Sequence, residues 1–531
     1  MGIKVAVNGK TAAAVESAID QLVADKVASR ISAKDFTLWG KDAESESAIR
    51  LGWTSSAVES QELVSGILEL KSYFSAEGVT RFVLCGMGGS SLAPEVITKT
   101  AGVELVVLDS TNPEQVGHAL SGDLGKTAVI VSSKSGSTVE TDSQKRLFEQ
   151  AFTAAGIDKT DRIVIVTDPG SPMEAAAKAD GYRIFNADPT VGGRYSALTA
   201  FGLVPSGLAG ADIHELLNDA VAASKILSED ATTNPGLVLG AVLARTANGT
   251  TFADKLGLVE AGTAIDGLGD WAEQLIAEST GKLGKGVLPV VLEASAPELT
   301  NKPADLVIAR LVADASHASE DEVSVSGSLG AQFLLWEYAT VVASRLIGIN
   351  PFDQPDVESA KIAARGMLEN RAAELPADFT EAGIEVRAKG IDLEGVDTVS
   401  GAVATFLATG ESDSYISIHA YLDRVGYPNV AGLRSAFAEK SGRPTTFGWA
   451  PRFLHSTGQY HKGGPAQGLY IQIVSRASKD ISVPGRDFTL GELIASQAAG
   501  DAEVLASHGR PVLTLTVSDV EAGLALILNS L

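Results

Sequence analysis

The segment RFVLCGMGGSSLAP, residues 81–94, joins an apolar run to a glycine-rich turn and then to the start of a helix. Pro94 suits the first turn of a helix, because the amide proton that it lacks would have no partner there. A strand, a tight turn and a helix in this order form the repeating unit of α/β proteins. The glycines also let backbone amides approach an anion at the positive end of the helix dipole. The segment therefore predicts an α/β fold with a candidate anion site at this turn.

Four further apolar runs follow before residue 190, and helical stretches separate them. They are VELVVLDS, TAVIVSSKSG, RIVIVTDPG and GYRIFNA, beginning at residues 103, 127, 162 and 181. Strands of nearly continuous apolar character that alternate with helices indicate a parallel sheet covered on both faces. The sequence therefore predicts a parallel sheet in this part of the chain.

Strand candidates return after residue 285, so the sequence predicts a second α/β unit. They are VLPVVLE, DLVIARL, YISIHAYL, TTFGW, LYIQIVS and PVLTLTV. The predicted fold class is α/β, with two domains that each hold a mostly parallel sheet flanked by helices. The predicted order is a helical N-terminal segment (residues 1–75), a first α/β domain (76–205), a helical connection (206–285) and a second α/β domain (286–531).

Two stretches inside the second unit have a distinct character. Residues 329–349 are apolar at helical spacing and end in NPFDQP, so we expect a buried helix that its prolines stop. Residues 374–400 are acidic and mixed, and we expect a variable, peripheral insertion near residues 370–410.

Composition narrows the classes of function. The chain has 531 residues, with 66 acidic and 42 basic side chains and a formal charge of -24. Nucleic acids are bound through clustered Lys and Arg, so no nucleic-acid partner is predicted. An anionic membrane surface would repel the same charge, and no apolar run is long enough to span a bilayer. Cys85 has no second cysteine to pair with, which favours a reducing compartment and predicts a cytoplasmic protein.

A second polar loop, SSKSGSTVET at residues 132–141, also leaves a predicted strand and enters a helix. Ser137 and Glu140 have the spacing of a capping box, which explains only those two residues. The hydroxyls around Lys134 match what a phosphate monoester binds, namely many donors and one positive charge. The first loop alone leaves a dinucleotide site or a structural turn as alternatives, since Asp109 closes the next strand about 20 residues on. Two such loops on neighbouring strands favour a sugar phosphate.

A carboxylate falls on an apolar helical face in the segment GLGDWAEQLIAESTGK, residues 267–282. Leu268, Trp271 and Leu275 form one stripe at helical spacing, and Glu278 is the next position on it. Burial and the negative end of the helix dipole both disfavour ionisation there, which suits a general base or acid. An ion pair with a neighbouring Lys or Arg is the alternative.

His455 and Arg194 are weaker candidates from the residues alone. His455 and His461 share the glycine-containing loop LHSTGQYHKGGP in a chain of 7 histidines, although a single histidine is more often structural. Arg194 follows two glycines, so its guanidinium is either held near an anion or exposed on a turn. No local spacing of Cys, His or Glu suits zinc, so no metal is predicted. Spacing marks neither Gln354 nor Lys361.

Taken together, these segments resemble phosphoglucose isomerases. The resemblance rests on the motifs GMGGSSLAP, SKSGSTVET, GGRYS, AESTGK, LHSTGQ and NPFDQPDVESAK. It extends from about residue 75 to about residue 520. The resemblance implies two sugar-isomerase-type α/β domains, with the active site between them and across a homodimer interface.

The resemblance also implies a role for each matched residue. Glu278 would move the proton between C1 and C2, His455 would open the sugar ring as an acid/base, and Arg194 would lie beside the enediolate. Gln354 and Lys361 would lie near the phosphate and the ring. The residues implied at the phosphate are Ser90, Ser133, Lys134, Ser135 and Thr138. Because an enediol intermediate needs a carboxylate, an acid and a cation, no cofactor is expected.

The motif order departs from that of familiar members, in which the histidine segment lies between the glutamate and lysine segments. Here the order is Glu278, Lys361, His455, which resembles the isomerase half of fused transaldolase and phosphoglucose isomerase chains. The sequence holds no counterpart of the transaldolase barrel, so association with a separate transaldolase is left open. The reordering weakens the assignments of Lys361 and His455, and His461 and Lys462 are kept as substitutes.

The leading hypothesis is an isomerase that interconverts glucose 6-phosphate and fructose 6-phosphate. An enzyme that also accepts mannose 6-phosphate is a second hypothesis, because a base over C1 and C2 does not fix the configuration at C2. From another class, a regulator could bind a sugar phosphate with the same loops and without catalysis. Glu278 separates these classes, since a sensor has no use for a carboxylate on an apolar helical face.

Overall fold

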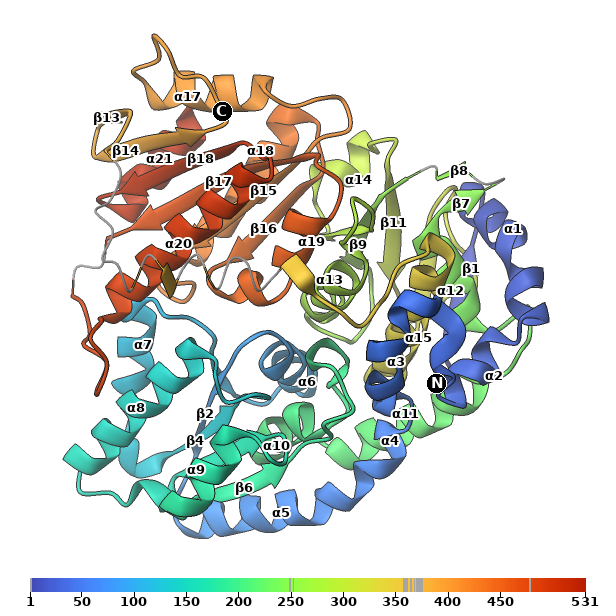
Figure 1. Cartoon of the computed structure of the whole chain (residues 1–531), viewed down its shortest axis with the longest axis horizontal. Helices are drawn as coiled ribbons and strands as arrows, with labels where there is room; N and C mark the ends of the chain where they lie inside the picture. Colours follow the sequence, from blue (N-terminus) through green and yellow to red (C-terminus); the bar gives the residue numbers. More distant parts are fainter. Residues whose placement is uncertain are drawn as a thin grey trace.

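The computed structural model describes residues 2–247, 250–251, 253–356, 362, 365–366, 368, 376–476 and 479–531. Three large sheets, each flanked by helices, make up a mixed α/β architecture (Figure 1). Lys361, one of the predicted site residues, lies outside the described residues. None of the helices in these ranges is both long and apolar enough to cross a membrane.

The first sheet is formed by the strands predicted before residue 190, and it is entirely parallel. Its order is β3 (Val106–Leu108), β2 (Arg81–Gly86), β4 (Thr127–Ser132), β5 (Ile163–Thr167) and β6 (Arg183–Asn186). Its flanking helices are α5 (Gln61–Ala76), α6 (Leu92–Ala101), α7 (Pro113–Leu120), α8 (Val139–Ala154), α9 (Pro172–Asp180) and α10 (Ala200–Ala209). Val83 and Val129 pack in one apolar cluster with α8, whereas Leu84 and Ile130 pack in another with α5 and α10. The prediction of a parallel sheet covered on both faces is confirmed.

The second sheet is parallel except at one edge. Its order is β1 (Lys4–Val7), β12 (Val323–Ser326), β11 (Leu306–Leu311), β9 (Lys255–Glu260) and β10 (Leu288–Leu292), and β1 is the antiparallel strand. Its helices are α1 (Lys10–Ala24), α11 (Ile213–Leu227), α12 (Pro235–Ala244), α13 (Leu268–Thr280), α14 (Pro297–Asn301) and α15 (Leu329–Ile347). The remaining short elements are α2 (Val27–Ser32), α3 (Glu44–Arg50), α4 (Ser56–Glu59), β7 (Thr246–Ala247) and β8 (Thr250–Thr251).

Two strands of the second sheet occupy stretches that the sequence pattern predicted as helical. Strand β1 lies in the N-terminal segment, and β9 lies in the expected helical connection. Lys4 pairs with Ser326, and β9 is hydrogen-bonded to β10 and β11, which follow it in the chain. These partners are distant in sequence, so local periodicity could not reveal either strand.

The expected buried helix over residues 329–349 is confirmed as α15. Trp336 and Tyr338 are among its fully buried side chains, and α15 packs against α11 and α12. The helix ends at Gly348, which adopts a left-handed conformation, so a glycine rather than the following prolines terminates it.

The third sheet contains the strands predicted after residue 400 together with an antiparallel hairpin. Its order is β13 (Phe379–Glu381), β14 (Ile384–Lys389), β18 (Val512–Val517), β17 (Gly468–Ser475), β15 (Tyr415–Tyr421) and β16 (Thr445–Trp449). Its helices are α17 (Val399–Ala408), α18 (Leu433–Ser441), α19 (Gly458–Gly463), α20 (Leu490–Ser507) and α21 (Val520–Asn529). The strands expected in one second unit thus belong to two sheets. The acidic stretch, expected at the periphery, forms the β13–β14 hairpin, and Phe406 of α17 is buried in the apolar core.

A buried polar cluster lies between the third sheet and helices α19 and α20. Lys462 Nζ pairs with Asp501 Oδ1 (2.7 Å), and His419 Nδ1 lies 3.3 Å from Asp501 Oδ2. His461 stacks on His419 with ring centroids 5.0 Å apart. Burial lowers the pKa of His419 and lowers the pKa of His461 further, so folding favours the neutral form of both rings.

Acidification should therefore destabilise the third sheet. Because the unfolded chain titrates these histidines near their usual pKa of about 6.5, the unfolded state binds more protons below that pH. We expect the free energy of unfolding in urea to fall by about 1 to 2 kcal/mol between about pH 7.5 and about pH 5.5. His461→Phe should reduce this pH dependence, whereas His317→Asn, at an exposed histidine, should retain it. An identical slope in wild type and His461→Phe would contradict the assignment.

Candidate active site

The glycine-rich turn after β2 brings two distant loops together. Gly88–Ser90 and Gly193–Tyr195 each form a 3-10 turn. A Cβ on Gly89 would overlap the carbonyl oxygen of Gly193, so only glycine permits this approach. A Cβ on Gly88 would lie 2.6 Å from the carbonyl oxygen of His455. The turn therefore lies against both the arginine loop and the histidine loop.

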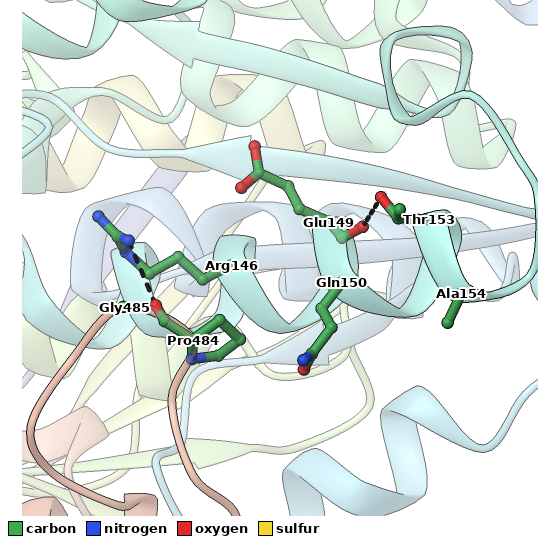
Figure 2. A pocket seen from close by; sticks show the side chains of 7 residues that line it. All are labelled: Arg146, Glu149, Gln150, Thr153, Ala154, Pro484 and Gly485. Carbon is green, nitrogen blue, oxygen red and sulfur yellow. Dashed lines mark hydrogen bonds between the residues drawn. The ribbon is translucent and has the colours of Figure 1, made fainter.

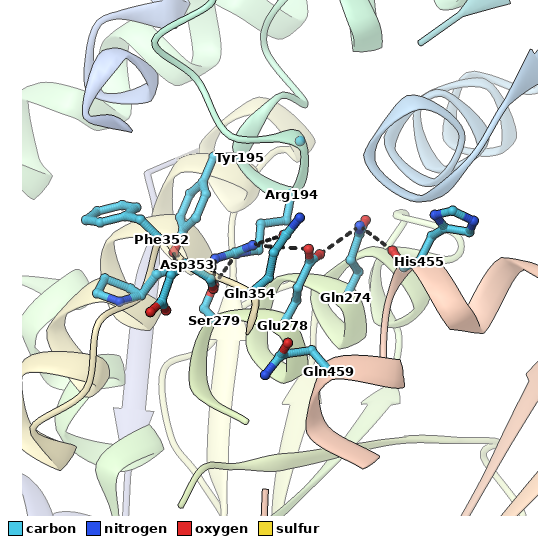
Figure 3. A network of polar contacts seen from close by, with 12 residues as sticks. Arg194, Tyr195, Gln274, Glu278, Ser279, Phe352, Asp353, Gln354, His455 and Gln459 are labelled. Carbon is cyan, nitrogen blue, oxygen red and sulfur yellow. Dashed lines mark hydrogen bonds and ion pairs between the residues drawn. The ribbon is translucent and has the colours of Figure 1, made fainter. Parts of the chain in front are cut away.

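Arg194 is at the centre of the polar network (Figure 3). Its side chain is buried, with 3% of its surface exposed. Nε donates to Ser279 Oγ (2.9 Å), and Nη1 donates to Gln354 Oε1 (2.8 Å). Nη1 also lies 3.1 Å from Glu278 Oε1. The alternative of an exposed arginine on a turn is therefore wrong, and the structure brings three predicted site residues into contact.

Glu278 occupies the last turn of α13 and is 7% exposed. Its Oε1 pairs with Arg194, so the ion pair that the sequence left as an alternative is present. Its Oε2 accepts a hydrogen bond from Gln274 Nε2 (3.1 Å), one helical turn earlier. Sequence reasoning missed Gln274, although residues four apart share a helix face and the spacing was available as a signal.

A buried lysine holds the segment after α15 against Arg194. Lys282 Nζ donates to the carbonyl oxygens of Asn350 (2.8 Å) and Asp353 (2.6 Å), and it pairs with Asp353 Oδ1 (2.7 Å). Burial, together with the nearby Arg194 guanidinium, lowers the pKa of Lys282 to about 8. Arg194 Nη2 also donates to the carbonyl oxygen of Asp353 (3.1 Å). These contacts fix Gln354 beside Arg194, and Lys282 is a second residue that the sequence did not single out.

His455 approaches the site from the third sheet. Its Nε2 lies 2.9 Å from Glu140 Oε1, a buried carboxylate that also accepts a hydrogen bond from Gln497 Nε2 (2.7 Å). The carbonyl oxygen of His455 accepts a hydrogen bond from Gln274 Nε2 (2.8 Å), the amide that also contacts Glu278. Gln274 therefore links the histidine segment to the glutamate.

Glu140 was assigned from its spacing to a capping box, and that assignment is wrong. Helix α8 begins after Thr138, whose side chain makes no capping hydrogen bond. Glu140 instead faces His455, which lies 315 residues later. No local signal in the sequence identifies a partner at that separation.

The lysine of the second loop is paired with a carboxylate that follows the next strand. Lys134 Nζ lies 2.5 Å from Asp168 Oδ2. Burial lowers the pKa of Lys134, although Asp168 opposes this shift, and burial raises the pKa of Asp168. Lys134 could exchange Asp168 for the anion of a ligand, and the ammonium would then keep a negatively charged partner in this partly buried place.

The predicted hydroxyl groups lie at the same end of the first sheet. Ser90 follows β2, and the remaining predicted hydroxyls follow the adjacent strand β4. Ser133 Oγ donates to Thr138 Oγ1 (3.3 Å) and accepts from the Gly136 amide (3.1 Å). The Ser135 side chain is exposed. The two loops are therefore side by side, as expected for the carboxyl ends of neighbouring parallel strands.

The substitutes proposed for the histidine and lysine do not join these residues. His461 and Lys462 belong to the buried cluster with Asp501 and are 1% and 3% exposed. Their burial follows from the short helix α19, which turns them toward the sheet. The histidine that reaches the network is His455.

An open groove elsewhere contains none of the predicted site residues (Figure 2). It lies between α8 and the loop at Pro484 and Gly485. Both of its charged side chains are already engaged, because Arg146 Nε donates to Asp142 (2.8 Å) and Glu149 pairs with Lys145 (2.9 Å). The groove is therefore a poorer candidate than the Arg194 network.

The network provides the groups that proton transfer on a small anion requires. A buried carboxylate is paired with a guanidinium, which can stabilise a developing negative charge nearby. The Glu140 carboxylate beside the His455 imidazole fixes which ring nitrogen carries the proton. The lysine-and-hydroxyl loop provides donors for a phosphate.

Comparisons with known proteins relate the chain to one family of isomerases. The family model of phosphoglucose isomerase matches residues 60–288. A probable glucose-6-phosphate isomerase from Natronomonas pharaonis is 30% identical over 398 residues, covering 64% of this chain and 90% of that relative.

Two solved structures share the fold. A hypothetical protein from Thermus thermophilus has a TM-score of 0.58 at 24% identity, with 68% of this chain and 99% of that chain covered. A glucose-6-phosphate isomerase from Chlamydia trachomatis has a TM-score of 0.52 at 18% identity, with 62% of this chain and 75% of that chain covered. The family match at residue 288 ends before the third sheet, which carries His455.

Replacing Lys282 with methionine should destabilise the protein. The substitution leaves the Asn350 carbonyl oxygen and the Asp353 carboxylate without this donor, and the Asp353 carbonyl oxygen keeps only Arg194, so we expect a loss of about 2 kcal/mol in the free energy of unfolding. Lys285→Met is the matched control, because the side chain of Lys285 is exposed and donates to the Ile347 carbonyl oxygen (3.1 Å). Equal urea midpoints for the two variants would contradict the role given to Lys282.

Proposed function

This chain belongs to the phosphoglucose isomerase family, and we propose that it interconverts glucose 6-phosphate and fructose 6-phosphate through a cis-enediol intermediate. This reaction is a step of glycolysis and gluconeogenesis. The observation that carries the proposal is the buried Arg194–Glu278 pair, which places a carboxylate beside a guanidinium without a competing water shell. The two polar loops at the end of the first sheet supply a nearby place for the phosphate.

The phosphate binds first in the proposed sequence. Ser90 and the second loop surround it with hydroxyl donors, and Lys134 supplies the positive charge. The residues proposed from the second loop are Ser133, Lys134, Ser135 and Thr138. The substrate phosphate competes with Asp168 for Lys134. The phosphate is favoured because a dianion attracts the ammonium more strongly than a single carboxylate does, and partial burial strengthens this attraction.

His455 then opens the sugar ring. Glu140 accepts a hydrogen bond from Nε2 of the imidazole, so Nδ1 is the nitrogen that exchanges a proton with the sugar. It takes the proton of the C1 hydroxyl and delivers one to the ring oxygen, which yields the open-chain aldehyde. We propose Gln354 near the phosphate and the ring, and we propose Lys361 there from the family resemblance alone.

Glu278 carries the proton in the isomerisation itself. It removes the proton from C2 of the aldose, and the resulting enediolate is stabilised by the Arg194 guanidinium. Glu278 returns the proton to C1, which gives the ketose. The two contacts of Glu278, with Arg194 and Gln274, hold both carboxylate oxygens in place. One proton moves from C2 to C1 and a hydroxyl proton moves from O2 to O1, while no electrons leave the substrate, so the proposal includes no redox cofactor.

The assembly and location are also proposals. We propose a homodimer on the family resemblance, although its interface need not supply the histidine, because His455 reaches Glu140 within one chain. Association with a separate transaldolase remains a prediction from the fused chains. A cytoplasmic location is supported by the single cysteine, Cys85, which is buried as a free thiol.

A coupled assay tests the proposed function. Purified protein is given fructose 6-phosphate, and glucose 6-phosphate is followed with an NADP-linked dehydrogenase in the presence of EDTA. Turnover is expected. Binding of the phosphosugar without turnover would favour the regulator, and formation of mannose 6-phosphate would identify the dual enzyme.

Glu278→Gln should retain substrate binding and lose at least about a hundredfold in kcat, the scale of a general-base contribution. The amide keeps the shape of the side chain but cannot accept the C2 proton. Isothermal titration with fructose 6-phosphate provides the control for binding. Near-normal turnover would remove Glu278 from the mechanism.

Lys134→Met should act on binding rather than on chemistry. Loss of the charge-assisted contact should raise KM for the phosphosugar by about tenfold to a hundredfold, with a smaller change in kcat. Lys145→Met is the matched control and should retain the wild-type KM, because Lys145 lies on α8 and pairs with Glu149 (2.9 Å). An unchanged KM for Lys134→Met would place the phosphate elsewhere.

A further inference from the structure

We infer that Arg452 is a positioning residue, which docks the third sheet onto the first so that His455 reaches Glu140. This inference rests on the proposed function, since it concerns the histidine proposed to open the ring. It adds a residue that touches none of the groups placed at the substrate.

Arg452 and His455 stand at the two ends of one 3-10 turn. Arg452 Nε pairs with Asp109, and Arg452 Nη2 pairs with Glu95. Both carboxylates belong to the first sheet and its helices, because Glu95 lies on α6 and Asp109 directly follows β3. The turn that carries the histidine is therefore anchored to the first sheet by a guanidinium fork.

The ion pairs of Arg452 with Glu95 and Asp109 are buried, and burial restricts the orientation of the guanidinium. Arg452, Glu95 and Asp109 are 8%, 8% and 1% exposed. In such surroundings, a guanidinium that forks onto two carboxylates has one favoured geometry, because rotation away from it separates the buried Arg452 charge from both carboxylates. A displacement of the turn by one residue would break both pairs.

A second contact fixes the other end of the same turn. The carbonyl oxygen of His455 lies against Gly88 and accepts the hydrogen bond from Gln274. Arg452 and the His455 carbonyl together define the position and the rotation of the turn relative to the first sheet. The His455–Glu140 contact follows from these two fixed points.

Other contacts also attach the two sheets, and one of them, from Gln497 Nε2 of α20 to Glu140 Oε1 (2.7 Å), meets the carboxylate that faces His455. Arg424 Nη1 pairs with Glu95 (3.0 Å), and Val483 and Leu490 pack in the apolar cluster of the first sheet. The third sheet should therefore remain attached when Arg452 is replaced, whereas the turn that carries His455 should no longer be held in its position relative to Glu140. Arg424 is the matched control, because it contacts the same two carboxylates as Arg452, Glu95 (3.0 Å) and Asp109 (3.7 Å), but belongs to a different loop.

The test is a double-mutant cycle with Arg452→Met and His455→Asn, measured by the coupled assay. Arg452→Met should lower kcat by about tenfold to a hundredfold in wild type, the cost of a misplaced catalytic group. The same substitution should lower kcat less than about twofold in the His455→Asn background, because the group that Arg452 positions is already absent. Arg424→Met should change kcat less than about threefold. Equal losses in both backgrounds would overturn the inference, since they would show a general structural effect.

Hydrogen exchange measures the docking independently of activity. Arg452→Met should accelerate amide exchange in residues 453–463 at least about tenfold, whereas Arg424→Met should not. Unchanged exchange in Arg452→Met would overturn the inference about docking, whether or not the protein is an isomerase. Absence of turnover in the wild-type protein would count against the proposed function and leave the docking inference to the exchange measurement. Arg452→Lys keeps the charge without the fork and should give the same pattern at smaller amplitude if Arg452→Met does not fold.

Discussion

A guanidinium that is 3% exposed has to find its partners inside the protein, and Arg194 finds them on segments that are far apart in the chain. It contacts Glu278 and Ser279 on α13 and Gln354 in the segment after α15. Removing one member of a buried, hydrogen-bonded pair typically costs about 3 to 5 kcal/mol, so the position of each segment depends on the others. Because Gly89 has no side chain, the arginine loop can come close enough to the glycine-rich turn for these contacts to form.

Helix α13 connects this pair to the rest of the molecule. It contacts α6 beside the first sheet, β10 of the second sheet and α19 beside the third. Gln274 and Glu278 face the histidine and the arginine from the same helix, one turn apart. The unusual motif order is thus compatible with one site, because the third sheet returns the histidine segment to the end of α13. In this arrangement Glu140, on the first sheet's helix α8, orients a histidine supplied by the third sheet.

The pattern of apolar residues along the chain correctly predicted the strands of the first sheet and the helix face that carries Glu278. The strands of the first sheet are apolar over their whole length, and Glu278 falls on a stripe that three apolar residues mark. The pattern failed where the partner is remote: β1 pairs with β12, β9 lies between two later strands, and Glu140 meets His455. Asp168, Lys282 and Arg452 were missed for the same reason, since a single charged residue carries no sign of its partner. Gln354 was found only through the family resemblance, because its spacing is unremarkable.

The central claim is that a carboxylate carries the proton between C1 and C2. The most direct measurement is conversion of fructose 6-phosphate in deuterium oxide, with the product followed by NMR. A proton held on Glu278 exchanges with solvent during its residence there, so the account predicts deuterium at C2 of glucose 6-phosphate. Rapid formation of glucose 6-phosphate with no deuterium at C2 would contradict it, because hydrogen would then move directly between the carbons.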